Sequence, residues 1–180
     1  MYRTLFSLLI AALLIAPAFS AEDEFTSKVI QIGMIVSDLD ASVKFYTEVV
    51  GLTEQAGFEV DADFGKRSGL TDSLPVKVRV LKVGAGEDAT QLKLMTFGNK
   101  AKKQTNEFIH TNTGIQYITI NVKELAPIVE RIKKHKVKFL GETPIPLGKR
   151  HFVMVKDPDG TFVELIGPMT QQKRFDSVFE

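Results

Sequence analysis

The sequence predicts an α+β fold made of two βαβββ halves whose strands form a cupped mixed sheet. Two observations lead to this prediction. Apolar residues alternate at strand spacing in several short segments and recur at helical spacing in two longer ones, in the same order in each half. The halves also match in sequence, because aligning Val36 with Val122 places Val43 against Val129. An internal repeat constrains the fold, since two like units can pair about a pseudo-twofold axis and enclose a cup.

The first half, residues 28–98, is expected to begin with a strand at 29–36, where β-branched residues are frequent. Ser37 or Asp38 then caps a helix that ends at Gly51, a residue suited to the left-handed conformation. One face of this helix carries apolar side chains at helical spacing, namely Leu39, Val43, Tyr46 and Val50. Three strands follow, with room for one helical turn between the first two; they are expected at 58–60, 76–83 and 91–97.

The second half, residues 114–169, repeats this order after a polar linker at 98–113. A strand is expected first, then a helix, a short extended segment and two final strands; their ranges are 115–122, 124–136, 137–140, 150–155 and 161–166. The last two strands flank an Asp-Pro-Asp-Gly turn, in which Gly160 can supply a positive φ. Residues 170–180 form a polar C-terminal tail.

The composition excludes several kinds of chemistry. The 180 residues contain no cysteine, so disulfides, cysteine zinc sites and cysteine nucleophiles are absent. The formal net charge is only +1 at pH 7, and a nucleic-acid-binding protein usually carries a basic surface. We therefore expect no nucleic-acid partner.

The N-terminus has the features of a signal peptide, which we assign to residues 1–20. Arg3 precedes an apolar run at 5–16, and the small residues Ala18 and Ser20 fit the positions before a cleavage site. The run is shorter than the roughly 20 residues that a membrane span needs. We therefore expect cleavage after Ser20, no membrane span afterwards, and a periplasmic or secreted protein.

Three stretches resemble the vicinal oxygen chelate superfamily, which includes glyoxalase I, bleomycin resistance proteins and dioxygenases. They are residues 32–52, residues 69–81 and residues 150–165, and the Asp-Pro-Asp-Gly turn followed by Glu164 is the most specific. The resemblance covers a single domain at 28–169. It implies the glyoxalase-like fold of duplicated βαβββ modules and a small-molecule ligand, and it makes a homodimer one expected state.

In metal-using members of this superfamily, one side chain from each of four strands lines the cup. The resemblance places these positions at Gln31, Lys93, Tyr117 and Glu164. Lys93 and Glu164 would be counterparts in the two halves, so we expect them to form an ion pair where relatives hold a metal. His151, at the start of a strand, is a further candidate for the cup.

These residues are a poor set of metal ligands. An ammonium group has no lone pair to donate near pH 7, and a neutral phenol is a weak ligand. Only Gln31 and Glu164 are ordinary donors, so we expect no cofactor. If a Zn²⁺, Ni²⁺ or Fe²⁺ ion does bind, these two residues are its expected ligands.

Three functions remain open at this point. The first is metal-free binding of a small molecule in the cup. The second is a glyoxalase-like lyase or isomerase, an epimerase or a dioxygenase, in which Glu164 is the expected catalytic residue and the metal chelates the substrate. The third is an interaction role in the cell envelope. Export weakens a glutathione-dependent role, since the glutathione adduct forms mainly inside the cell. Fold alone does not choose among these functions.

Overall fold

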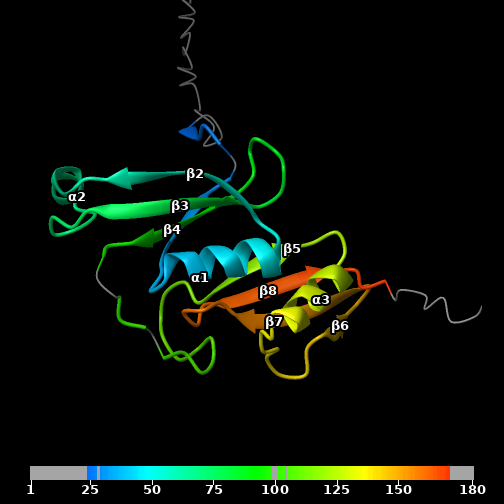
Figure 1. The fold of residues 1–180 in the computed structure, drawn as a ribbon. Helices are drawn as coiled ribbons and strands as arrows, with labels where there is room; N and C mark the ends of the chain where they lie inside the picture. The colour runs from blue at the N-terminus through cyan, green and yellow to red at the C-terminus, as the bar shows by residue number, and fades with distance from the viewer. Residues whose placement is uncertain (1–23, 28, 99–100, 104, 171–180) are drawn as a thin grey trace, which may run out of the picture.

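The computed structural model describes residues 24–27, 29–98, 101–103 and 105–170, and it repeats one βαβββ pattern (Figure 1). The first half contains β1 (Gln31–Ile35), α1 (Leu39–Lys44), the π-helical segment η2 (Phe45–Val50), β2 (Thr53–Val60), α2 (Ala62–Ser68), β3 (Val76–Lys82) and β4 (Gln91–Thr96). The second half contains β5 (Tyr117–Asn121), α3 (Ala126–Lys134), β6 (Ile145–Leu147), β7 (Arg150–Lys156) and β8 (Phe162–Gly167). The signal peptide predicted at 1–20 lies outside the described residues, as does the tail from 171 onward.

Each half forms a four-stranded sheet of the same topology. The N-terminal sheet has the order β1-β4-β3-β2 and the C-terminal sheet the order β5-β8-β7-β6. The first strand of each half lies parallel to the last, and the other neighbours are antiparallel. The registers also correspond, since Gly33 pairs with Lys93 in one sheet and Thr119 pairs with Glu164 in the other. The duplicated fold is thereby confirmed, and Lys93 and Glu164 are structural counterparts.

The first helix forms where the apolar pattern predicts it. Asp38 is its N-cap, and the carboxylate accepts a hydrogen bond from the Ala41 N–H at 2.9 Å. Gly51 ends η2 with a φ of 100°, a conformation that residues with a β-carbon rarely adopt. The buried side chains of α1 and η2 include Val43, Tyr46 and Val50.

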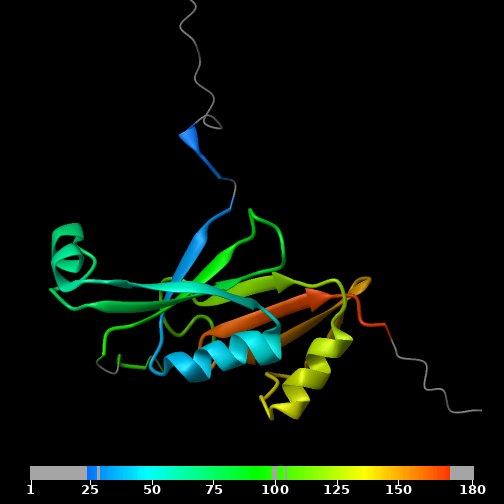
Figure 2. The ribbon, with the colours of Figure 1, turned by 45° about the horizontal axis from the view of Figure 1, so that its top comes forward.

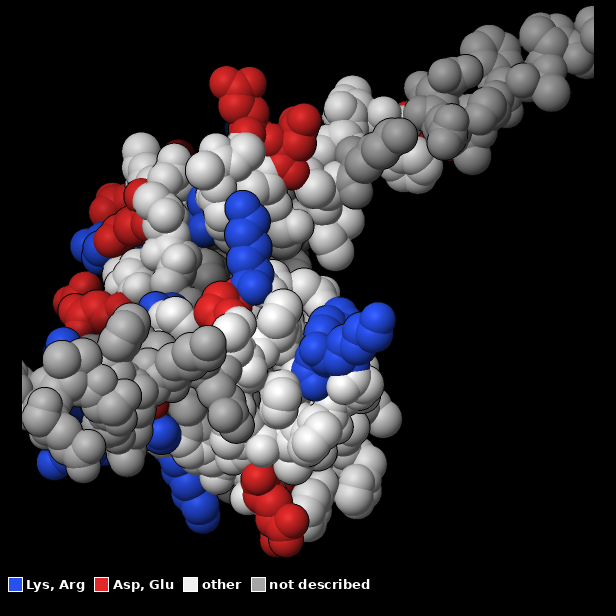
Figure 3. Space-filling view, turned by 90° about the vertical axis from the view of Figure 1, so that its right-hand side faces the viewer, with Lys and Arg blue, Asp and Glu red and all other residues white. Residues whose placement is uncertain are grey.

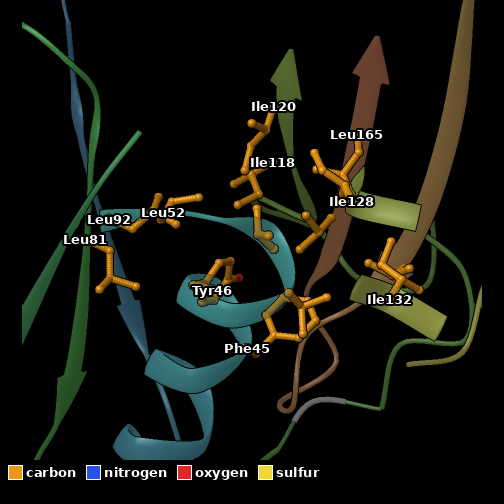
Figure 4. Packing of buried hydrophobic residues seen from close by; sticks show 14 of the residues in the cluster. Phe45, Tyr46, Leu52, Leu81, Leu92, Ile118, Ile120, Ile128, Ile132 and Leu165 are labelled. Carbon is orange, nitrogen blue, oxygen red and sulfur yellow. The ribbon is translucent and has the colours of Figure 1, made fainter. Parts of the chain in front are cut away.

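The core lies between the two sheets and includes the buried faces of α1, η2 and α3. Figure 4 shows Tyr46 of η2 between Leu92 of the N-terminal sheet and Ile120 of the C-terminal sheet. The buried face of α3 joins the same cluster through Ile128 and Ile132. One face of each sheet therefore contributes to a common core that unites the halves.

We call the opposite face of each sheet its outer face. Side chains alternate along a strand, so the neighbours of core residues point away from the core. Gln31 and Lys93 lie on the outer face of the N-terminal sheet, next to the core residues Ile32 and Leu92. Tyr117 and Glu164 occupy the outer face of the C-terminal sheet. Figure 2 shows that α1 and α3 leave these strands uncovered on that side.

Two strands differ from the sequence prediction. The strand expected at 58–60 begins already at Thr53, because β2 pairs with β3 across a register shift between Gln55 and Phe58. The extended segment expected at 137–140 contributes only an isolated bridge between Phe139 and Val155, and the edge strand is β6 instead. An edge strand forms where a segment can hydrogen-bond to the neighbouring strand. Residues 145–147 pair with β7 in this way.

Candidate functional site

The first pair of predicted site residues lies on the N-terminal sheet. Gln31 is exposed and donates a hydrogen bond from Nε2 to Oε1 of Gln91 at 3.0 Å. The Lys93 ammonium lies 5.9 Å from the centre of the Phe58 ring, at the outer limit of a cation–π contact. Val80 is the neighbour of Lys93 across the sheet. Lys93 is thus a cation in apolar surroundings.

The second pair lies on the C-terminal sheet. Tyr117 has 47% of its surface exposed at the start of β5. Glu164, on β8, is half-buried and accepts a hydrogen bond from the hydroxyl of Thr119. Met154 is its neighbour on β7. A carboxylate therefore occupies the position that an ammonium occupies in the other half.

The structure does not join the two pairs within one chain. Among the described residues no hydrogen bond or ion pair links Lys93 with Glu164, so the ion pair expected from the sequence is not formed. The reason is the arrangement of the core, since each outer face points away from the helices that both sheets share. The predicted site is therefore divided into two half-sites, with Gln31 and Lys93 on the N-terminal sheet and Tyr117 and Glu164 on the C-terminal sheet.

His151 lies apart from these half-sites. It shares a face of β7 with Val153 and Val155, which belong to the core, whereas Glu164 faces the other way beside Met154. The Nδ1 atom of His151 is buried without a hydrogen-bond partner in the described structure. The alternation of β7 therefore puts this side chain on the helix-covered face rather than in the predicted cup.

The donor set does not fit a metal. Lys93 offers an ammonium and Tyr117 a phenol, and neither is a ligand that divalent ions prefer. Within the described residues, no group of three or more His, Asp or Glu side chains is arranged to hold a metal ion. The residues at these positions therefore do not fit a divalent metal ion.

The Asp-Pro-Asp-Gly turn joins the halves, a role that sequence reasoning missed. The buried Asp157 carboxylate accepts hydrogen bonds from the Tyr46 hydroxyl at 3.0 Å and from the Thr161 N–H at 2.8 Å. Asp159 accepts from the Ser37 N–H at 2.9 Å and from the Ser37 hydroxyl. The motif was visible in the sequence, but its local turn geometry gave no sign of partners more than 100 residues away.

The two carboxyl groups of this turn have opposite electrostatic properties. Burial raises the pKa of Asp157, although the hydrogen bonds it accepts oppose the change. At Asp159 burial acts in the same direction, but the hydrogen bonds from Ser37 and the nearby Lys103 outweigh it and lower the pKa. Burial and the neighbouring Asp157 raise the pKa of the Tyr46 hydroxyl well above its usual value. Tyr46 thus stays a neutral donor.

A cavity of about 350 Å³ opens between the end of β1 and the start of β5. Its wall combines apolar and polar side chains, including Ile35, Lys102 and Gln116. It borders the outer face of the N-terminal sheet through Gly33 and Ile35, but the four predicted cup residues do not line it. Sequence reasoning gave no indication of this space, because it forms where separate elements meet.

The surface carries charges of both signs. Figure 3 shows basic and acidic side chains interspersed on one side of the molecule, without a continuous basic area. None of the helices in the described ranges has the length and apolar character needed to cross a bilayer.

Comparison with known proteins identifies the family. The model of the Glyoxalase/Bleomycin resistance protein/Dioxygenase superfamily matches residues 28–165. A probable lactoylglutathione lyase of Vibrio parahaemolyticus is 28% identical over 137 residues, which cover 73% of this chain and 83% of the relative.

Two solved structures share the fold. A glyoxalase family protein from Bacillus cereus has a TM-score of 0.66 at 17% identity, covering 84% of this chain and 100% of its own. An antibiotic-binding protein from Streptomyces has a TM-score of 0.51 at 21% identity, covering 79% of this chain and 96% of its own. Together with the family model, the duplicated sheets show that this chain belongs to the Glyoxalase/Bleomycin resistance protein/Dioxygenase superfamily.

Proposed function

We propose that this protein binds a small molecule without a metal, using the outer faces of its two sheets. The observation that carries the proposal is Lys93, an ammonium at a position where the family resemblance implies a metal ligand in metal-using relatives. A positive charge there repels a divalent ion and attracts an acceptor or anionic group. The proposal therefore follows from side-chain chemistry.

The surroundings of Lys93 favour a particular kind of ligand. Phe58 and Val80 provide an apolar surface beside the ammonium, while Gln31 provides an amide. Sites with apolar walls and a few polar groups fix the orientation of small organic molecules. We expect an apolar molecule that carries an anionic or hydrogen-bond-accepting group.

A glyoxalase-like lyase is the second candidate, and the sequence relationship favours it. The relative from Vibrio parahaemolyticus bears the name of a probable lactoylglutathione lyase. Members of the family commonly use a divalent metal, for which this chain offers Gln31 and Glu164 as ordinary donors. Glu164 would then be the catalytic carboxylate. The sequence relationship therefore favours a metal-dependent lyase, whereas the side chains of Lys93 and Tyr117 favour metal-free binding. The metal content of the purified protein distinguishes these two functions.

Metal analysis and a thermal-shift screen test the proposal. We expect the purified protein, incubated with Zn²⁺, Ni²⁺ or Fe²⁺ and desalted, to hold far less than one ion per chain by mass spectrometry. Ligands of the expected class should raise the melting temperature, since a ligand at 100 times its Kd stabilises the native state by about 2.7 kcal/mol. No lactoylglutathione should form from methylglyoxal and glutathione.

The double variant Lys93→Glu with Tyr117→His is the matched positive control. It restores a carboxylate and an imidazole at the two unsuitable positions, so it should bind Zn²⁺ or Ni²⁺ under the same conditions. Stoichiometric metal in the unmodified protein, lost on Glu164→Ala, would reject metal-free binding and support the lyase.

A further inference from the structure

The outer face of the N-terminal sheet changes from polar to apolar along its strands. Residues that pair across neighbouring strands form rows, and the members of one row lie on the same face. At one end, Lys82 shares a row with Thr53, Gln91 and Gln31, and the next row contains Lys93. Beyond Lys93 the rows are apolar, and their members are Phe58, Val78, Met95, Ile35, Val60, Val76 and Phe97. This face therefore matches a molecule with one charged and one apolar end.

Two ammonium groups lie at the polar end. The register of β3 and β4 makes Lys82 and Lys93 diagonal neighbours. Such neighbours are about 7–8 Å apart, which is within reach of long side chains. Within the described residues neither lysine makes an ion pair, not even with Glu87 or Asp88 in the connection between β3 and β4. Both positive charges can therefore meet a ligand.

The amides beside these lysines add further donors. Gln31 donates from Nε2 to Oε1 of Gln91 at 3.0 Å, and in the described structure the Gln91 amide nitrogen has no acceptor of its own. Ammonium and amide N–H groups donate hydrogen bonds, so this cluster matches an anion with several acceptor oxygens. A phosphate monoester has three such oxygens and a charge of about −1.5 to −2 at pH 7. A carboxylate carries a single charge and leaves one ammonium without a counter-charge.

The apolar end can accommodate a hydrocarbon arm. Val76 and Val78 are 1% and 2% exposed and form its base, whereas Phe58 and Ile35 are 44% and 55% exposed. Exposed apolar areas of this kind mark binding surfaces. Four residues along β3 separate the row of Lys93 from Val76, a distance of about 13 Å at the rise of a strand.

A hollow of about 570 Å³ lies where the apolar rows end. Val60 and Phe97 belong to its apolar wall, and the carboxylates of Glu59 and Asp61 outnumber the ammonium of Lys77 on its charged side. Negative charge repels an anion. The charged end of a ligand therefore faces Lys82 and Lys93, and its arm points toward the hollow.

We propose that the ligand of this face is an amphipathic phosphate monoester, with its phosphate between Lys82 and Lys93 and its hydrocarbon arm along β3. The inference rests on the proposed function, because it uses the same face and the same ammonium of Lys93. It adds the chemical class of the ligand and a second cation, Lys82, that recognises the phosphate.

Isothermal titration calorimetry with decyl phosphate, kept below the concentration at which it forms micelles, tests the proposal. Decyl phosphate should bind at least about 10-fold more tightly than decanoate, which has a similar arm but a single charge. Ethyl phosphate, which lacks a long arm, should bind at least about 100-fold more weakly than decyl phosphate, because little apolar surface is buried.

Variants of the two lysines separate their roles. Lys82→Gln should weaken the binding of decyl phosphate about 10-fold or more and that of decanoate less than about 3-fold, since it removes only the second positive charge. Lys93→Gln should weaken the binding of both. Lys82→Arg keeps the charge and should retain the preference for decyl phosphate. The control is Lys123→Ala, an exposed lysine outside this face, which should bind both ligands like the unmodified protein.

Equal affinities for decyl phosphate and decanoate, or a Lys82→Gln variant that binds both without loss, would overturn the inference. If Lys93→Gln still weakens decanoate binding in that case, the proposed function stands and only the phosphate assignment fails. Co-sedimentation with vesicles containing phosphatidic acid, without binding of monomeric decyl phosphate, would assign the same chemistry to a lipid surface and overturn the small-molecule ligand. Stoichiometric metal rejects the proposed function whatever the calorimetry shows.

Discussion

At the residue scale, the turn at 157–160 shows how one local motif acquires a long-range role. Asp157 is only 5% exposed and carries a carboxylate into the core, where the Tyr46 hydroxyl and backbone amides are its donors. A buried polar group without partners costs about 1–3 kcal/mol. These contacts therefore stabilise the junction between the halves.

Tyr46→Phe should lower the free energy of unfolding by about 1–3 kcal/mol at pH 7, because it removes a donor from a buried carboxylate. The pKa of Asp157 is raised in the folded state, so the stability that this group contributes falls as pH rises through that pKa. The hydrogen bond that this variant loses stabilises the ionised form of Asp157. The destabilisation should consequently be smaller at pH 4 than at pH 7 in urea titrations.

Tyr117→Phe is the matched control for this measurement. Its hydroxyl belongs to an exposed side chain, and its removal should change stability by less than about 0.5 kcal/mol at either pH. An equal loss for Tyr46→Phe at both pH values would show that the bond to the Asp157 carboxylate is not its cause.

At the scale of elements, the C-terminal end of η2 is completed by a side chain from the other half. The last carbonyls of a helix lack partners within it. Arg131 of α3 donates from Nε to the Val49 carbonyl at 2.9 Å and from a terminal nitrogen to the Val50 carbonyl at 3.1 Å. The guanidinium thus ties η2 to α3.

Arg131→Ala should destabilise the protein by roughly 2 kcal/mol, since two charge-assisted hydrogen bonds to helix-end carbonyls are lost. Arg131→Lys should recover only part of this loss, because an ammonium lacks the planar fork that reaches both carbonyls. Chemical denaturation monitored by circular dichroism measures both effects.

Lys133→Ala provides the comparison on the same helix. Among the described residues its ammonium pairs with the exposed Glu130 alone, and such a surface pair is worth about 0–1 kcal/mol. If Arg131→Ala costs no more than Lys133→Ala, the hydrogen bonds to η2 do not stabilise the fold.

At the scale of the whole molecule, the two halves share one core and leave two faces uncovered. The family model matches residues 28–165, and the elements of the two halves run from Gln31 to Gly167. We further propose that the protein is exported by the N-terminal segment, which the structure does not describe. Export would place the binding site in the periplasm or outside the cell.

The mature protein should begin at Ala21 when it is produced with its own N-terminus in a secreting host. The apolar run at 5–16 is short enough for a cleaved signal, and Ala18 and Ser20 satisfy the need for small residues before the cut. Intact-mass spectrometry measures the product. Ala18→Lys should block cleavage, and an unmodified product that retains Met1 would contradict the assignment.

The sequence by itself determined the duplicated pattern, the helix that ends at Gly51, and the chemistry of Gln31, Lys93, Tyr117 and Glu164. These properties are local, because periodicity and side-chain type are properties of short segments. It also paired Lys93 with Glu164 as counterparts, since a repeat carries its register along the chain.

Only the tertiary structure decided how the halves meet. The sheets share the helices between them, so the predicted cup is divided into two half-sites, and Asp157 reaches Tyr46 across 111 positions of the chain. The edge strand β6 likewise forms where β7 offers hydrogen bonds, not where residues 137–140 look extended. Periodicity reports which side of an element is buried, but not what buries it, because the burying surface comes from distant parts of the chain.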